Sequence, residues 1–183
     1  GTFTNPVLAL DYSDPDVIRV GEDYYMVTST FMDCPGTAVL HSNDLVNWET
    51  VGYAIENPEE SIGDRYSADS MGWYGNGVYA PSIRYHDGTF YVYSPVYNNG
   101  GIYVSTATDP AGPWTTTCLK DKNGKDIKIE RLTDLCPLWD DENNCAYLLL
   151  SNLGSSGQGI DYVTDEGCQT GNAAQLFKMS LDG

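Results

Sequence analysis

The sequence predicts an all-β protein built as a β-propeller, of which this chain supplies about the first three blades. Two observations lead to this prediction: three segments of the chain repeat in one register, and the repeats contain recurring hairpin patterns. Composition agrees, because the 183 residues include 19 Gly and 14 Tyr and offer no convincing helical periodicity of 3.6 residues.

The repeat is marked by proline and tyrosine. The segments DPDVIRVGEDYYMVTS, APSIRYHDGTFYVYS and CPLWDDENNCAYLLLS each place a proline near their start and a tyrosine ten residues after it. These pairs are Pro15 and Tyr25, Pro81 and Tyr91, and Pro137 and Tyr147. A register that recurs in this way predicts one repeated structural unit.

The inner part of each unit is a predicted hairpin. VIRV turns at Gly21-Glu22-Asp23 into YYMVTST, and SIRYH turns at Asp87-Gly88 into TFYVYSPV. Asp-Gly between alternating strands is a strong hairpin signal. A second strand pair follows in AVLHSNDLVNWETVG and in IYVSTATDPAGPWTTT, where an Asp turn precedes Trp48 or Trp114.

Four short strands per unit favour propeller blades, which bury their faces against one another. We expect blade 1 at about residues 10–60, blade 2 at about 78–122 and a partial blade 3 at about 130–183. An antiparallel sandwich is the alternative, because evenly spaced short strands fit both architectures.

Charge and cysteine content narrow the classes of function. The formal net charge of −17 argues against nucleic acids and anionic membranes as partners, and it fits a neutral ligand such as a sugar. No apolar run approaches the roughly 20 residues of a membrane-spanning helix. The five cysteines form no C-x-x-C pair, and together with only two histidines they predict no structural zinc site.

Two acidic residues stand where the predicted innermost strands begin. Asp14 directly precedes Pro15, and Asp134 lies three residues before Pro137, whereas Ala80 takes this place in the second repeat. Innermost strands surround one axis, so these carboxylates are expected to converge. Glycoside hydrolysis uses one carboxylate to activate water and one carboxylic acid to protonate the leaving oxygen. The alternative for Asp14 is a turn residue, because Ser-Asp-Pro-Asp is good turn chemistry.

The chain resembles glycoside hydrolase family 43 over nearly its whole length. The segments that carry the similarity are NPVLALDYSDPDVIRVGEDYYMVTSTF, PGTAVLHSNDLVNWETVGYA, GVYAPSIRYHDGTFYVY, DPAGPW and TDLCPLWDDENNCAYLLLSN. The resemblance implies a five-bladed β-propeller catalytic domain. It also implies an inverting, exo-acting glycosidase of β-xylosidase or α-L-arabinofuranosidase type, which releases pentoses from hemicellulose or arabinan. A non-catalytic carbohydrate-binding propeller is the alternative from another class.

The resemblance further implies roles for individual residues. Asp14 stands at the position of the family's general base, and Asp134 at the aspartate that tunes and orients the acid. The family often has Asp-Pro at the second position, where this chain has Asp134-Leu135. The family's acid is a Glu in an E-G-P sequence after the strand that here reads QLFKMS. No E-G-P occurs in these 183 residues, so the acid is expected outside them.

Aromatic residues supply sugar platforms through their apolar ring faces. Phe31, Trp73 and Tyr79 are the candidate substrate-binding residues, with core or blade packing as the alternative for each. No cofactor is expected to be required, and a structural calcium ion is left open. The expected partners are an oligosaccharide or polysaccharide and the remaining part of the propeller, from the same gene product or a second chain. A secreted or cell-envelope location is expected, with an intracellular one left open.

Overall fold

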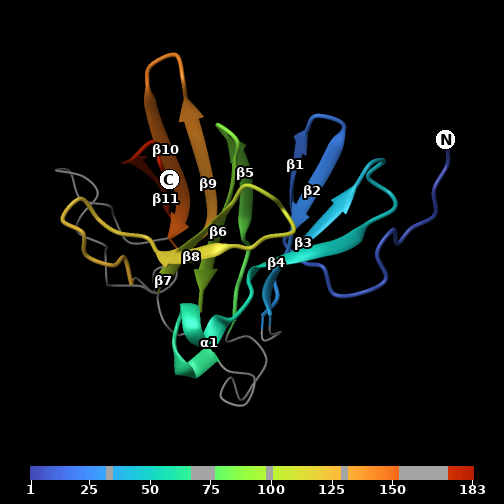
Figure 1. Ribbon diagram of the computed structural model, residues 1–183, viewed down its shortest axis with the longest axis horizontal. Helices are drawn as coiled ribbons and strands as arrows, with labels where there is room; N and C mark the ends of the chain where they lie inside the picture. The colour runs from blue at the N-terminus through green and yellow to red at the C-terminus, as the bar shows by residue number, and fades with distance from the viewer. Residues whose placement is uncertain (32–34, 67–76, 98–100, 129–131, 153–172) are drawn as a thin grey trace.

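The computed structural model describes residues 1–31, 35–66, 77–97, 101–128, 132–152 and 173–183. In this part of the chain, the strands form three antiparallel sheets that follow one another along the sequence (Figure 1). The chain is therefore all-β, as predicted. Successive sheets that each pack on the next do not fit the two-sheet sandwich that the sequence left open as the alternative.

The first sheet is a meander of four strands in the order β1-β2-β3-β4. The strands are β1 (Asp16–Val20), β2 (Asp23–Val27), β3 (Gly36–Ser42) and β4 (Glu49–Ile55). Gly21 takes a φ of 64° in the β1–β2 turn, a conformation that glycine adopts without steric cost. The predicted hairpin is confirmed, since Val20 pairs with Asp23 across this turn.

The second sheet repeats this order with β5-β6-β7-β8. Its strands are β5 (Ser82–His86), β6 (Thr89–Val96), β7 (Gly101–Ala107) and β8 (Thr115–Cys118). The predicted turn at Asp87-Gly88 is confirmed. Both residues have positive φ, as a two-residue type I′ hairpin turn requires.

The third sheet has the order β11-β10-β9. Its strands are β9 (Leu132–Asp140), β10 (Cys145–Asn152) and β11 (Ala173–Met179). The first strands of the three sheets lie beside one another, with β5 between β1 and β9 (Figure 1). Residues that begin these strands are therefore brought to one region, although they lie far apart in the sequence.

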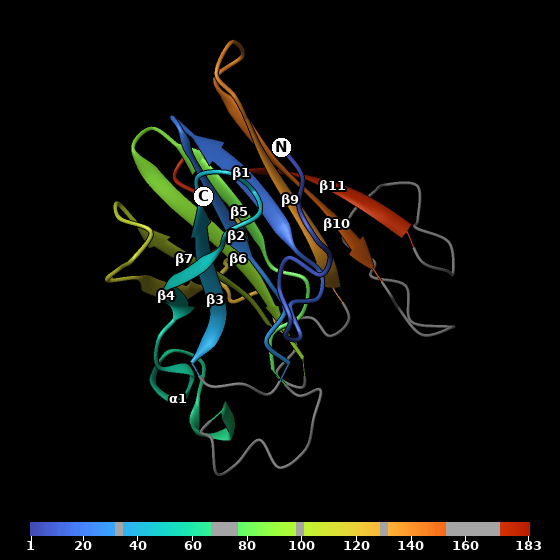
Figure 2. The same ribbon diagram turned by 90° about the vertical axis from the view of Figure 1, so that its right-hand side faces the viewer.

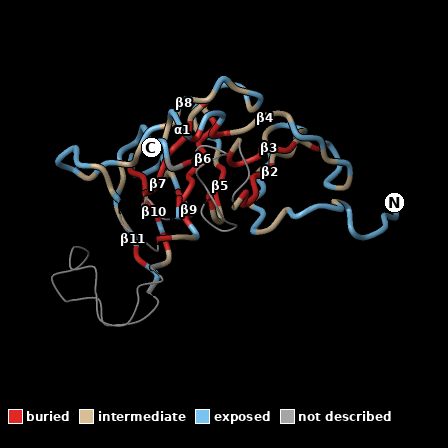
Figure 3. Tube along the Cα trace, turned by 90° about the horizontal axis from the view of Figure 1, so that it is seen from below, coloured by how far each residue is buried: buried red, intermediate tan, exposed pale blue. Residues whose placement is uncertain are grey.

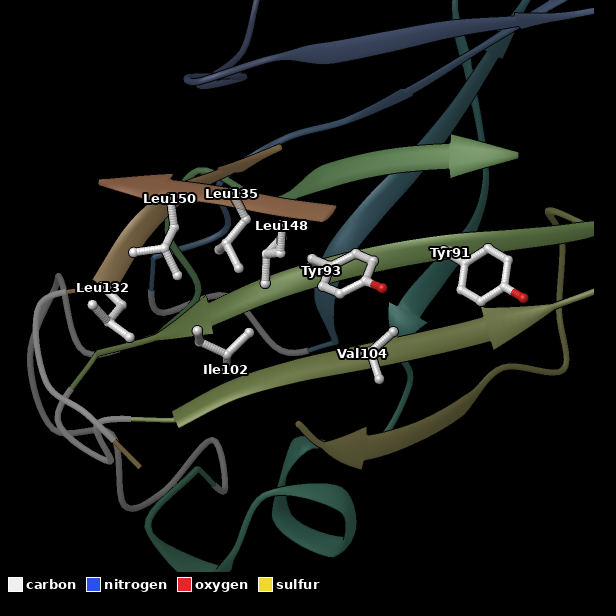
Figure 4. Packing of buried hydrophobic residues seen from close by; sticks show 8 residues of the cluster. All are labelled: Tyr91, Tyr93, Ile102, Val104, Leu132, Leu135, Leu148 and Leu150. Atoms are coloured by element: carbon white, nitrogen blue, oxygen red, sulfur yellow. The ribbon is translucent and has the colours of Figure 1, made fainter. Parts of the chain in front are cut away.

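Apolar side chains fill the spaces between neighbouring sheets. The cluster between the second and third sheets comes from β6 and β7 on one side and from β9 and β10 on the other (Figure 4). Its buried members are Tyr91, Tyr93, Ile102, Val104, Leu132, Leu135, Leu148 and Leu150. A second cluster, which includes Val27, Val39, Ile83 and Val92, joins the first sheet to the second. Buried residues accordingly run along the strands in the middle of the molecule (Figure 3).

A short helix follows the first sheet, although the sequence shows no convincing helical periodicity there. The helix α1 (Pro58–Ser61) is capped by Asn57, whose side chain accepts from the backbone N–H of Glu60, and a 3-10 turn spans Asp64–Tyr66. Figures 1 and 2 both place α1 at one end of the sheets. In the described part of the chain, no helix is long and apolar enough to span a membrane.

Candidate active site

Asp14, Ala80 and Asp134 share an unusual backbone conformation. Their φ angles are 52°, 33° and 55°, in the left-handed region that side chains other than glycine seldom adopt. Asp14 and Ala80 each precede the proline that leads into β1 or β5, whereas Asp134 lies near the start of β9. The chain thus takes a positive φ ahead of, or early in, the first strand of each sheet, and two of the three positions carry a carboxylate.

The Asp14 carboxylate is exposed and is held by one hydroxyl. Ser29 Oγ donates to Asp14 Oδ2 at 2.6 Å, and the Ser29 backbone N–H donates to the Ser13 carbonyl at 3.0 Å. Ser29 follows the end of β2 and is buried. The side chain of Asp14 is therefore fixed on one edge and open to solvent on the other.

Asp134 occupies a β-bulge in β9. The pairing of β9 with β10 changes register between Leu149 and Ser151, opposite the segment that contains Asp134. Bulges redirect a side chain at the expense of one ladder hydrogen bond. Asp134 is exposed, and Thr133 Oγ1 donates to its Oδ1 at 3.3 Å. Asp14 and Ala80 are each followed directly by a proline, whereas Asp134 is followed by Leu135. At Asp134 the left-handed φ accompanies the bulge.

Phe31, two residues after Ser29, and Tyr79, directly before Ala80, lie together. Their ring centroids are 5.1 Å apart in an edge-to-face arrangement, and Tyr79 also lies 5.4 Å from Tyr97. The backbone N–H groups of Thr30 and Phe31 both donate to the Val78 carbonyl. Burial raises the pKa of Tyr79, and Tyr97 adds to this effect. Trp73, the third aromatic candidate, lies outside the described residues.

One link between the first and second sheets passes through Ser29. Its Oγ accepts from the backbone N–H of Ala80 at 2.7 Å while donating to Asp14. Ala80 directly follows Tyr79 in the chain. The structure therefore brings Asp14, Phe31 and Tyr79 into one neighbourhood through Ser29 and Ala80. Asp134 is on β9, which β5 separates from β1.

Arg84 forms a network that sequence reasoning did not find. Its Nη1 donates to Asp16 Oδ2 on β1 at 2.5 Å, and its Nη2 lies 3.3 Å from Cys136 Sγ on β9. The backbone N–H of Ile83 also donates to Asp16 Oδ2, at 2.9 Å. Burial would lower the pKa of Arg84, but the Asp16 charge and these hydrogen bonds outweigh it and raise the pKa.

A hollow of about 290 Å³ lies elsewhere, at the turn between β3 and β4. Its lining residues are His41, Ser42, Asn43, Asp44, Asn47, Trp48 and Glu49. Asp44 accepts from the backbone N–H groups of Val46 and Asn47, and the indole N–H of Trp48 donates to the Leu45 carbonyl. These hydrogen bonds stabilise the turn between β3 and β4. We therefore assign the hollow to the shape of this turn and not to a binding site.

Over the described residues, no group of three or more His, Cys, Asp or Glu side chains is placed to hold a metal ion. Cys118, Cys136 and Cys145 are free thiols. Glu166, which belongs to the only Glu-Gly pair of the sequence, lies outside the described residues.

Comparison with known proteins decides the family. The family model of glycosyl hydrolases family 43 matches residues 3–177. The chain belongs to this family. A β-xylosidase of Formosa agariphila is 34% identical over the whole chain, which covers 28% of that protein. A non-reducing end α-L-arabinofuranosidase of Bacteroides ovatus is 44% identical over 117 residues, or 62% of this chain and 21% of the relative.

Solved structures of family 43 members share the fold. The family 43 protein BlXynB of Bacillus licheniformis superposes with a TM-score of 0.63 at 32% identity, over 81% of this chain and 28% of that chain. A bifunctional family 43 protein of Bacteroides eggerthii gives 0.67 at 27% identity, over 98% and 19%. The chain thus spans about a quarter of the length of the curated relatives named above.

Proposed function

We propose that the protein containing this chain is an inverting, exo-acting glycoside hydrolase that releases xylose or arabinose from plant cell-wall hemicellulose or arabinan. The names of the two relatives, a β-xylosidase and an α-L-arabinofuranosidase, support this substrate class. We further propose that the catalytic domain is a five-bladed propeller, with residues 10–60, 78–122 and 130–183 in its first three blades.

The observation that carries the proposal is the setting of Asp14. An exposed carboxylate, fixed by a buried hydroxyl and placed near an aromatic pair, fits a general base beside a sugar platform. In this mechanism, Asp14 removes a proton from a water molecule that attacks the anomeric carbon. An inverting enzyme leaves room for that water, with about 6.5–9.5 Å between base and acid.

The acid of the reaction is proposed to be a Glu outside residues 1–183. Asp134 would keep this Glu protonated, because a nearby negative charge raises the pKa of a carboxylic acid. The exposed position of Asp134 on an innermost strand supports this role. Phe31, Tyr79 and, from the sequence, Trp73 would contact the apolar face of the pentose.

The remaining blades are proposed to pack on the free face of the third sheet. Leu138, Leu149 and Leu176 are 61%, 41% and 60% exposed there, one on each of its three strands. Leu149 pairs directly with Leu176, so these side chains lie on one face. Apolar residues grouped on a sheet face indicate a surface that another element covers.

The site of action follows from the substrate. A plant cell-wall polymer cannot enter a cell intact, so we propose a secreted or cell-envelope location, with uptake of short oligosaccharides as the intracellular alternative. The acidic chain, with a net charge of −17, fits a neutral substrate. Metal analysis of the full-length protein tests for a structural calcium ion on the propeller axis.

The stereochemistry of hydrolysis tests the proposal. The full-length protein is incubated with p-nitrophenyl β-D-xylopyranoside and p-nitrophenyl α-L-arabinofuranoside, and the first anomer released is observed by ¹H NMR. We expect the inverted anomer from at least one substrate. Release of the retained anomer contradicts the mechanism, and binding of xylo-oligosaccharides without turnover would support the non-catalytic alternative.

A further inference from the structure

The hydroxyl of Ser29 has only one arrangement that satisfies both of its neighbours. The backbone N–H of Ala80 can only donate, so Ser29 Oγ accepts from it at 2.7 Å. The single hydroxyl proton is then directed to Asp14 Oδ2, 2.6 Å away. Ser29 is 2% exposed, so water does not compete for this proton. The backbone N–H of Ala80 therefore donates to Ser29 Oγ, and Ser29 Oγ donates to the Asp14 carboxylate.

We infer that Ser29 is the positioning residue of the proposed general base, an inference that rests on the function proposed above. The hydroxyl holds one carboxylate oxygen of Asp14 and leaves the other free to face the attacking water. A hydrogen bond of this kind, with an ionised acceptor, is short and directional. Ser29 does not touch substrate in this account; it acts through Asp14.

The same hydroxyl aligns the base with the aromatic pair. Ala80 follows Tyr79 directly, and the Tyr79 ring contacts Phe31. The Ser29 bridge therefore sets the position of Asp14, just before β1, relative to the Tyr79 ring, just before β5. Loss of the bridge should misplace the base by a fraction of an ångström to an ångström, which is enough to slow a reaction that depends on orientation.

Thr30 provides a matched control. It is the next residue, it is 7% exposed, and its Oγ1 accepts from the backbone N–H of Thr37 at 3.0 Å. Replacing Thr30 with alanine thus also removes a buried hydroxyl that satisfies a backbone N–H. The difference between the two positions is that only Ser29 donates to Asp14.

The experiment compares Ser29→Ala, Ser29→Thr and Thr30→Ala in the full-length protein, using an aryl pentoside and thermal unfolding. We expect Ser29→Ala to lower kcat by about ten- to a hundred-fold with KM within about twofold, because the base is misplaced while the binding surface stays. Ser29→Thr, which keeps the hydroxyl, should recover most of kcat. Thr30→Ala should lower the unfolding midpoint to a similar extent and keep kcat within about threefold.

Two outcomes overturn the inference: an unchanged kcat in Ser29→Ala, or an equal loss of kcat in Thr30→Ala. If Ser29→Ala does not fold, Ser29→Cys, which retains nearly the same volume with a weaker donor, takes its place in the comparison. Asp14→Asn distinguishes the assignment of Asp14 as the general base from the positioning role of Ser29. Full activity in Asp14→Asn removes the base assignment itself, whereas an inactive Asp14→Asn beside a fully active Ser29→Ala removes only the role of Ser29.

Discussion

Arg84 on β5 donates to the Asp16 carboxylate on β1 at 2.5 Å, and this contact joins the first two sheets by an ion pair. Both side chains are partly buried, with 27% and 30% of their surface exposed. The second nitrogen of the guanidinium reaches Cys136 on β9, so one side chain connects the first strands of all three sheets. Asp16 and Cys136 each lie two residues after a candidate catalytic aspartate, so the network joins the strands next to these residues.

Removal of the Arg84 side chain should destabilise the protein. Arg84→Met leaves Asp16 without its ion-pair partner, and we expect a loss of about 1–3 kcal/mol because a partly buried charge is left unpaired. The thermal unfolding midpoint of the full-length protein measures the effect. Arg19→Met is the control, since Arg19 pairs with Glu22 on the surface, where such pairs contribute little. Equal shifts in the two variants would contradict a structural role for the Arg84 network.

The His41 ion pair should make stability depend on pH. The hydrogen bond that His41 donates to the Asp23 carboxylate raises the pKa of His41 above its ordinary 6.5, with a smaller contribution from Glu49. The same contact, with one from Asn43, lowers the pKa of Asp23 below 3.8. The stabilisation is therefore fully present between these ordinary values. It is lost as the pH rises through the raised pKa of His41 or falls through the lowered pKa of Asp23.

Comparison of His41→Asn with the unmodified protein tests this dependence. The difference between their unfolding midpoints should be largest near pH 5 and should shrink toward pH 9. A difference that stays constant over this range would show that His41 stabilises the fold by packing and hydrogen bonding alone.

Truncation of Phe31 should weaken substrate binding more than it slows chemistry. Its ring faces Tyr79 and belongs to the proposed sugar platform. Phe31→Ala should raise KM for aryl xylosides or arabinofuranosides about five- to tenfold, the effect of losing one aromatic contact. Steady-state kinetics measure the change, with Tyr24→Ala in the β1–β2 hairpin as the control. An unchanged KM in Phe31→Ala would assign the ring to packing.

The 183-residue chain on its own should be inactive. It contains no Glu in an E-G-P sequence, and its third sheet exposes Leu138, Leu149 and Leu176. We expect no turnover of aryl pentosides and self-association in light scattering, because an exposed apolar sheet face and open strand edges attract other chains. Turnover by a monomer would instead mean that a carboxylate within these residues serves as the acid, and Glu166 would be the first to examine.

The sequence predicted the strands well because their signals are local. Asp87-Gly88 is a turn signal between two alternating runs, and the structure has a hairpin there. The search for helical periodicity missed α1, although Asn57-Pro58 followed by two glutamates is the pattern of a capped helix start. A helix of 4 residues is too short to show a period of 3.6 residues.

The site was only partly predictable. Asp14 and Asp134 stood out by their place in the repeat, and both have the same left-handed backbone. Ser29 and the Asp16–Arg84 pair were not found, because their partners lie 51 and 68 residues away in the chain. Contacts between sheets leave no periodic trace in a single sequence. The bulge at Asp134 likewise depends on pairing with β10, which the register of prolines does not reveal.

The measurement that tests the central claim most directly is the kcat of Asp14→Asn in the full-length protein, beside Asp16→Asn. Asparagine keeps the shape of the side chain and cannot accept the proton of water. We expect kcat of Asp14→Asn to fall by about a hundred- to ten-thousand-fold, the contribution of a general base. Asp16→Asn should lower the unfolding midpoint and keep kcat within about threefold, since Asp16 binds Arg84. An Asp14→Asn variant that retains kcat, or an equal loss in both variants, would contradict the assignment of Asp14 as the base.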